Sequence, residues 1–86
     1  MKYDIVIERS ALKFLAKISG TDKEKIITAI EKLSINPRPI GAKKLTGRDG
    51  WRIKINNYRV IYEIIDKICK ILILDIGHRK DIYRVF

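Results

Sequence analysis

Apolar and polar residues alternate along the stretch Trp51–Tyr62, and this alternation predicts a β-hairpin near the middle of the chain. Asn56–Asn57 separates its two halves, and asparagine tolerates the positive φ angles of a two-residue hairpin turn. Because side chains alternate between the two faces of a strand, one face of the hairpin is expected to be largely apolar. The other face then carries Arg52, Lys54 and Arg59, with Lys54 directly opposite Arg59.

Helical spacing of apolar residues predicts two helices before the hairpin. The first covers roughly Arg9–Ile18, and the second opens at Thr21, which forms a capping box with Glu24. The second ends at Asn36–Pro37, because the residue before a proline is disfavoured in the helical region. Phe14 lies off the first stripe, where it either widens the core face or meets a partner. The two predicted stripes are Ala11, Leu12, Leu15 and Ile18, and Ile26, Ile27, Ala29, Ile30 and Leu33.

Three further strands are predicted, at Tyr3–Ile7, Ala42–Leu45 and Cys69–Gly77. The last is the most hydrophobic, so we expect it inside the sheet. Short links between the later strands favour antiparallel pairing, and two short-linked helices favour an antiparallel pair. The chain is therefore expected to be a single α+β domain over residues 1–86, of order βαα-βββ. Its antiparallel sheet of four to five strands carries the helix pair on one face.

The register of the last strand depends on the turn at Asp66–Lys67. A two-residue turn would place Lys70, Leu72 and Leu74 on the Arg59 face, whereas a three-residue turn would place Ile71, Ile73, Asp75 and Arg79 there. The second register is preferred because it buries alternate apolar residues under the helices and brings Asp75 and Arg79 beside Arg59. The residues buried in that register are Leu72, Leu74 and Ile76.

The net charge of the 86-residue chain is +9, and the excess lies in its second part. Residues 1–37 hold seven Lys/Arg and five Asp/Glu, whereas residues 38–86 hold twelve and five. Such an imbalance favours a polyanion such as nucleic acid, or an acidic protein. Membrane-surface binding would require these cations on an amphipathic helix, but most fall on predicted strands and loops.

The cysteine and histidine content of the chain excludes several kinds of cross-link, metal site and catalytic mechanism. The single cysteine, Cys69, excludes an internal disulfide and a Cys-rich zinc site, and the single histidine, His78, excludes a two-histidine ribonuclease mechanism. The charged start of the chain does not fit a signal peptide, and its apolar runs are too short to span a bilayer. A cytoplasmic protein without a metal cofactor is expected.

Five short motifs occur in one order over nearly the whole chain: Asn36–Pro39, Lys43–Gly47, Trp51–Lys54, Tyr58–Tyr62 and Gly77–Tyr83, or NPRP, KKLxG, WRIK, YRVIY and GHRKDxY. The ordered set resembles the RelE branch of the RelE/ParE toxin superfamily. This resemblance implies a toxin of a type II toxin–antitoxin pair. It also implies metal-independent cleavage of mRNA in the ribosomal A site, and a RelB-type antitoxin through which the toxin would reach operator DNA.

The resemblance also implies a set of site residues. The two basic residues of the catalytic strand correspond to Arg52 and Lys54, the following-strand arginine to Arg59, and the arginine after the last strand to Arg79. The C-terminal tyrosine corresponds to Tyr83, whereas Arg52 stands where the family commonly has lysine. Contacts to ribosomal RNA are expected from basic residues of the loops and strand ends, namely Lys43, Lys44, Arg48, His78 and Lys80.

Metal-free RNA cleavage uses the 2′-hydroxyl as nucleophile, so it needs a base, stabilisation of the phosphorane, and help for the leaving 5′-oxygen. Lys54 is the candidate base, because a lysine crowded by cations has a reason to lose its proton. Arg52 and Arg59 are suited to binding the non-bridging oxygens. Arg79 is the candidate for stabilising the leaving group, and Tyr83 is the candidate for stacking on or orienting a nucleobase. Two alternatives stay open: a ParE-like inhibitor of DNA gyrase, and a basic module that binds RNA or protein without chemistry.

Overall fold

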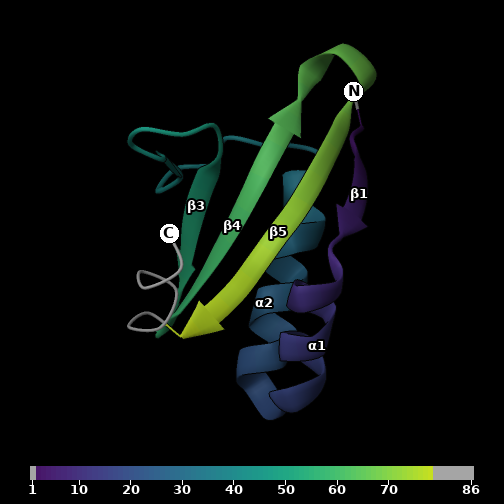
Figure 1. Cartoon of the computed structure of the whole chain (residues 1–86). Coiled ribbons are helices and arrows are strands. Elements are labelled where there is room, and N and C mark those ends of the chain that lie inside the picture. Colours follow the sequence, from purple (N-terminus) through teal and green to yellow (C-terminus); the bar gives the residue numbers. More distant parts are fainter. Residues whose placement is uncertain (1, 79–86) are drawn as a thin grey trace.

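The computed structural model describes residues 2–78, and its five strands form one sheet in the order β1-β5-β4-β3-β2. The elements are β1 (Asp4–Ile7), α1 (Arg9–Lys17), α2 (Gly20–Leu33), β2 (Lys43–Lys44), β3 (Trp51–Ile55), β4 (Tyr58–Ile65), the 3-10 turn η1 (Asp66–Ile68) and β5 (Lys70–His78). Both helices lie on one face of the sheet (Figure 1). The predicted α+β fold is confirmed. Because β1 runs parallel to β5 while the other neighbours are antiparallel, the sheet is mixed.

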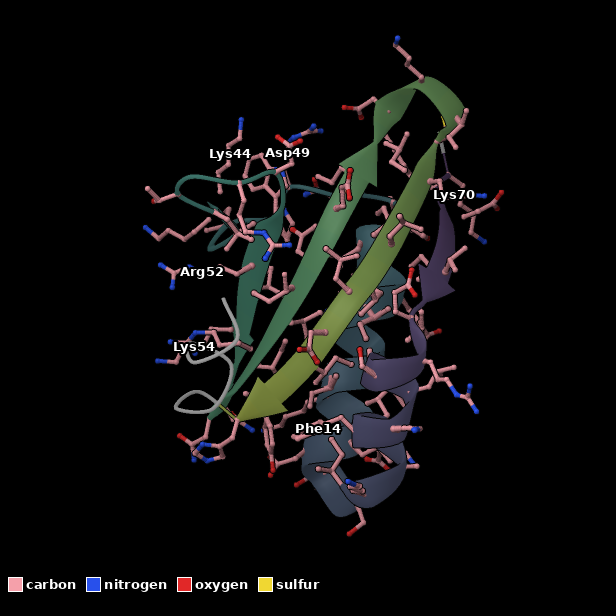
Figure 2. The ribbon with its side chains drawn as sticks, in the orientation of Figure 1. Phe14, Lys44, Asp49, Arg52, Lys54 and Lys70 are labelled. Atoms are coloured by element: carbon pink, nitrogen blue, oxygen red, sulfur yellow. The ribbon has the colours of Figure 1, made fainter. Side chains whose placement is uncertain are left out.

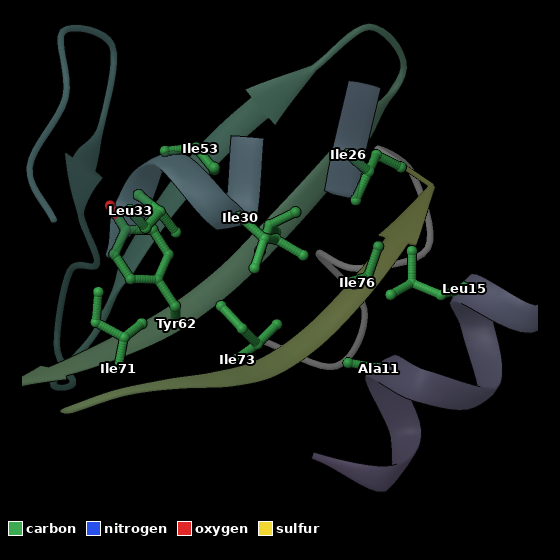
Figure 3. Close-up of a cluster of buried hydrophobic side chains, with 11 residues drawn as sticks. Ala11, Leu15, Ile26, Ile30, Leu33, Ile53, Tyr62, Ile71, Ile73 and Ile76 are labelled. Carbon is green, nitrogen blue, oxygen red and sulfur yellow. The ribbon is translucent and has the colours of Figure 1, made fainter. Parts of the chain in front are cut away.

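The core lies between the helices and the sheet face that they cover, as Figure 3 shows. It contains Ala11, Leu15, Ile26, Ile30, Leu33, Ile53, Val60, Tyr62, Ile71, Ile73 and Ile76. Tyr62 is fully buried, and its hydroxyl donates a hydrogen bond to the carbonyl oxygen of Pro37 at 2.8 Å. Burial raises the pKa of Tyr62 to about 12, although the positive charge of Arg38 opposes that shift. The core tyrosine therefore stays neutral and fixes the loop after α2.

The predicted register of β5 is wrong in its first half and right in its second. Four residues, 66–69, separate β4 from β5, so Ile71 and Ile73 point into the core. Leu72 and Leu74 are only half-buried. A β-bulge then shifts the register, because Ile61 pairs with Asp75 while Tyr62 pairs with Ile73. Bulges place two residues opposite one, and from this point on the expected arrangement holds. Asp75 and Gly77 lie on the Arg59 face, and Ile76 lies in the core.

The helix boundaries and stripes also differ from prediction. α2 begins at Gly20, where a φ of 71° reverses the chain, and Ser19 rather than Thr21 is its N-cap, without a side-chain capping bond. The helix ends at Leu33, before Asn36. Leu12 is 51% exposed and Ile27 is 38% exposed, because each helix buries only the side that faces the sheet. Phe14 instead joins the core edge, its ring 5.9 Å from that of Tyr58.

A polar cluster at the opposite end of the sheet from the Asn56–Asn57 turn holds the loop between α2 and β2. Arg38 Nη2 donates to Asp66 Oδ2 at 2.9 Å, and the Tyr3 hydroxyl donates to Asp66 Oδ1 at 2.6 Å. The Arg38 guanidinium also lies 5.4 Å from the centre of the Trp51 ring, within cation–π range. The cluster therefore joins β1, the loop after α2, β3 and the turn after β4.

This cluster predicts a stability that depends on pH. The hydrogen bonds from Arg38 and Tyr3 lower the pKa of Asp66. A carboxyl whose folded pKa is depressed contributes stability above its unfolded pKa, near 3.9, and loses it as the pH falls through the folded value. We expect Asp66→Asn to lower Tm at pH 6–7, and the difference from wild type to shrink as the pH falls below the unfolded pKa of the carboxyl and through its folded pKa.

Asp49→Asn, which makes the same charge change in an exposed turn, provides the control in these melting curves. An equal loss of Tm in both variants would show that net charge, and not the cluster, is responsible.

Candidate functional site

Two pairs of like charges face each other across neighbouring strands on the sheet face opposite the helices. The hairpin register is the predicted one, with the turn at Asn56–Asn57 and Lys54 opposite Arg59. The short strand β2 adds a second pair, because Lys43 lies opposite Arg52. Like charges directly opposite each other destabilise a sheet, so the fold gains no stability from placing four cations together.

These cations surround a pocket of about 220 Å³ that is lined by Gly41, Lys43, Arg52, Lys54 and Arg59. We call it the cationic pocket. Lys54 is exposed, whereas Arg52 and Arg59 are half-buried. Arg52 and Lys54 point away from β3 at the edge of the sheet (Figure 2). The pocket combines a large positive charge with partial exclusion of water, which strengthens its attraction for an anion.

One side-chain nitrogen of Arg59, a residue that lines the pocket, indicates what kind of ligand the pocket would bind. Its Nη1 is buried and has no hydrogen-bond partner within residues 2–78. A buried polar group without a partner costs roughly 1–3 kcal/mol, and more when it is charged. Arginine presents a planar fork of donors that matches the oxygens of a phosphate. The unpaired nitrogen therefore indicates that the pocket is built for an anionic oxygen.

The residues opposite Arg59 leave its charge uncompensated. Its register partner on β5 is Gly77, which has no side chain to fill the space. Asp75, which we expected beside Arg59, instead accepts a hydrogen bond from the backbone N–H of Ile76 at 2.9 Å. Within residues 2–78, Asp75 forms no ion pair with Arg59. The local charge is therefore available to a ligand.

Three predicted catalytic residues, Arg52, Lys54 and Arg59, thus meet in one pocket together with Lys43. Gly41 was not predicted, since nothing in the sequence fixes where its loop passes. Lys44 and Arg48 are exposed on β2 and the following turn. His78 pairs with Tyr58, their rings 5.8 Å apart, and so belongs to the helix-covered face rather than to the pocket.

Arg79, Lys80 and Tyr83 lie outside the described residues, so their predicted roles stay predictions. Within residues 2–78 no group of three or more His, Cys, Asp or Glu side chains is placed to hold a metal ion. No helix in this part of the chain is long and apolar enough to cross a membrane.

The chain is similar to known toxins along almost its whole length. Residues 5–83 match the model of the ParE toxin family of type II toxin–antitoxin systems. A relative from Methanocaldococcus jannaschii, a RelE1 toxin by name, is 32% identical in an alignment 90 positions long that covers 98% of this chain and 98% of the relative. The chain therefore belongs to the RelE/ParE superfamily of type II toxin–antitoxin toxins.

Solved structures of RelE proteins share the fold. A free Escherichia coli RelE double mutant has a TM-score of 0.78 at 24% identity, with 100% of both chains covered. RelE in the RelE–RelB complex of Pyrococcus horikoshii has a TM-score of 0.78 at 26% identity, with 92% of this chain and 97% of that one covered. RelE in the intact E. coli RelBE complex has a TM-score of 0.77 at 28% identity, with 88% and 95% covered.

Because Arg59 Nη1 is buried without a partner within residues 2–78, we predict that Arg59 lowers the stability of the free protein. An apolar side chain of similar length has no donor to satisfy, so it avoids the cost of the unsatisfied nitrogen. We expect Arg59→Met to keep Tm unchanged or to raise the free energy of unfolding by about 1–3 kcal/mol. Inorganic phosphate should raise the Tm of the wild type by binding the folded state, but not that of Arg59→Met.

Lys13→Met, on the exposed side of α1, makes the same charge change and should keep the full response to phosphate. A drop of several degrees in the Tm of Arg59→Met would show that Arg59 supports the fold and is not a ligand-binding group.

Proposed function

We propose that this RelE-like toxin is a ribosome-dependent, metal-independent mRNA endonuclease of the cytoplasm. The observation that carries the proposal is the buried Nη1 of Arg59, which has no partner within residues 2–78 and lies in the wall of the cationic pocket. A phosphate oxygen supplies the acceptor that this nitrogen lacks. The resemblance to RelE toxins supports mRNA on the ribosome as the source of that phosphate.

In the proposed reaction, Lys54 removes the proton of the 2′-hydroxyl and the 2′-oxygen attacks the adjacent phosphorus. Arg59 and Arg52 bind the non-bridging oxygens, where negative charge develops in the transition state. Lys43 adds positive charge at the same wall of the pocket. The bond from phosphorus to the 5′-oxygen then breaks, which leaves a 2′,3′-cyclic phosphate and a 5′-hydroxyl.

Two further residues are assigned by resemblance alone. Arg79 stabilises the charge on the leaving 5′-oxygen, which takes its proton from water, because arginine is too weak an acid to supply one. Tyr83 stacks on or orients a base. Lys44, Arg48, His78 and Lys80 are assigned contacts with the ribosomal RNA backbone.

A ParE-like inhibitor of DNA gyrase is the second candidate function, because the family model that matches the chain is that of ParE toxins. Gyrase inhibition by binding has no need for cations opposite each other across two strand pairs. We therefore rank it below the nuclease.

The central test is primer extension on translated mRNA. Arg59→Ala and Arg79→Ala should abolish cutting on the ribosome, because each removes charge from the transition state. Lys13→Ala and Lys17→Ala, both exposed on α1, should cut as the wild type does. A wild-type protein that leaves mRNA intact but inhibits supercoiling by gyrase would establish the ParE-like function instead.

The role of Lys54 predicts a steep pH profile. A general base acts only in its deprotonated form, so below the pKa of the base the rate increases about tenfold per pH unit. Single-turnover cleavage with saturating ribosomes should rise almost tenfold per unit between pH 6 and 8. Lys54→Ala should lose both the rate and this slope, whereas Lys17→Ala keeps both. A wild-type profile that is flat over this range would show that Lys54 binds phosphate through its charge and is not the general base.

A RelB-type antitoxin is the proposed partner, since similar RelE proteins have been solved in complex with RelB. Val6, Leu12 and Ile27 are exposed apolar side chains on β1, α1 and α2, and we propose each of them as a contact for such a partner. Co-expression with an adjacent short acidic gene should give a complex that survives purification and does not cut mRNA. Recovery of the free, harmless chain alone would count against a toxin–antitoxin pair.

A further inference from the structure

A second groove adjoins the cationic pocket, between α2 and the end of β3. It encloses about 580 Å³ and is open to solvent along the helix. One residue, Lys54, lines both the groove and the cationic pocket. The groove is lined by Glu24, Lys25, Thr28, Ala29 and Lys32 from α2, and by Lys54, Ile55 and Asn56 from the hairpin.

The described residues that line this groove carry a net positive charge. It holds three lysines, Lys25, Lys32 and Lys54, against a single carboxylate, Glu24. None of the three lysines forms an ion pair within residues 2–78. Lys25 and Lys32 are two turns apart on α2, or about 10 Å along the helix axis. Together with Lys54 they extend the positive charge of the cationic pocket around the edge of the sheet.

A hydrogen bond from one of the lining residues, Asn56, holds the two sides of the groove together. Asn56 Nδ2 donates a hydrogen bond to Asp22 Oδ1 at 2.9 Å, which ties the hairpin turn to the first turn of α2. The neighbouring strand β2 reaches β3 only as far as Arg52. β2 therefore does not cover the edge of β3 at Lys54, which is the residue shared by the groove and the cationic pocket.

We propose that the groove holds the single-stranded RNA backbone that continues from the phosphate in the cationic pocket, with Lys25 and Lys32 bound to its phosphates. The proposal rests on the proposed function, because it takes the ligand of the pocket to be RNA. Grooves of this kind combine a basic surface that follows the backbone with aromatic rings on which bases stack. None of the described residues that line this groove is aromatic, so we expect binding through phosphate contacts, which are independent of sequence.

An acidic peptide is the other polyanion to consider for this groove, and the lining fits it less well. Peptide recognition relies on apolar pockets for alternate or helically spaced side chains. Only Ala29 and Ile55 are apolar here. The direct continuity with the cationic pocket through Lys54 favours a ligand whose charge repeats along its length, as that of RNA does.

The test is the salt dependence of binding to a 2′-deoxy oligonucleotide, which cannot be cleaved and needs no ribosome. Each phosphate contact with a single strand contributes about −0.7 to the slope of log K against log salt. Lys25→Ala/Lys32→Ala should make the slope less steep by about 1.4 and weaken binding roughly 25-fold at 0.1 M salt. Lys13→Ala/Lys17→Ala removes the same charge from exposed positions on α1 and should leave the slope unchanged.

Equal slopes for both double variants would overturn the proposal, since only net charge would then matter. So would unaltered oligonucleotide binding by Lys25→Ala/Lys32→Ala together with weaker binding of an acidic partner protein, which would assign the groove to a peptide. Because the readout is binding, it is separate from the proposed nuclease activity. A wild type that binds the oligonucleotide but does not cut mRNA would refute the nuclease and keep the groove, whereas failure to bind at low salt would refute the groove.

Discussion

The hydrogen bond from the Tyr62 hydroxyl to the Pro37 carbonyl connects the hydrophobic core of this protein to the loop that leads to the cationic pocket. Tyr62 is fully buried in the core, and Pro37 lies in the loop that runs from α2 past Gly41 to β2. A buried tyrosine hydroxyl needs a partner, and the carbonyl before Arg38 provides it. The same packing that stabilises the core therefore also sets the position of one wall of the cationic pocket.

The cationic pocket itself lowers the stability of the folded domain. Lys43 lies opposite Arg52, Lys54 lies opposite Arg59, and a buried nitrogen of Arg59 has no partner within residues 2–78. Such strain is found where a binding site must be ready before its ligand arrives. The opposite face of the sheet offsets it, because the two helices cover a continuous cluster of isoleucine, leucine and tyrosine side chains. A small domain has little stability to spare, so each cation there is a significant cost.

The sequence was most informative where one local rule decided the structure. The two-residue turn at Asn56–Asn57 and the alternation around it predicted the hairpin register, and with it the position of Lys54 opposite Arg59. Prediction failed where contacts between residues far apart in the sequence determine the structure. The bulge in β5 that shifts Ile73 relative to Asp75 leaves no local signal, because both registers bury apolar residues. The exposure of Leu12 depends on how far α1 is covered by the sheet, which helical spacing does not specify.

The positions of Gly41 and Lys43 in the cationic pocket both depend on tertiary contacts. Lys43 was predicted on a short strand, but its place opposite Arg52 follows from pairing with β3, which the sequence leaves open. The position of Gly41 follows from the anchored loop. Resemblance to RelE toxins identified the cations of the hairpin, and the structure adds the residues that complete the pocket around them.

The brevity of β2 has a consequence for the solubility of the molecule. An outer strand normally exposes unpaired backbone groups that another chain can join, and proteins prevent such joining with very short or lysine-bearing edge strands. β2 is two residues long, and both are lysine. The opposite edge strand, β1, has only four residues. The lysines of β2 thus also discourage one copy of the toxin from extending its sheet into the next, which lets a strongly cationic surface remain exposed without seeding aggregates.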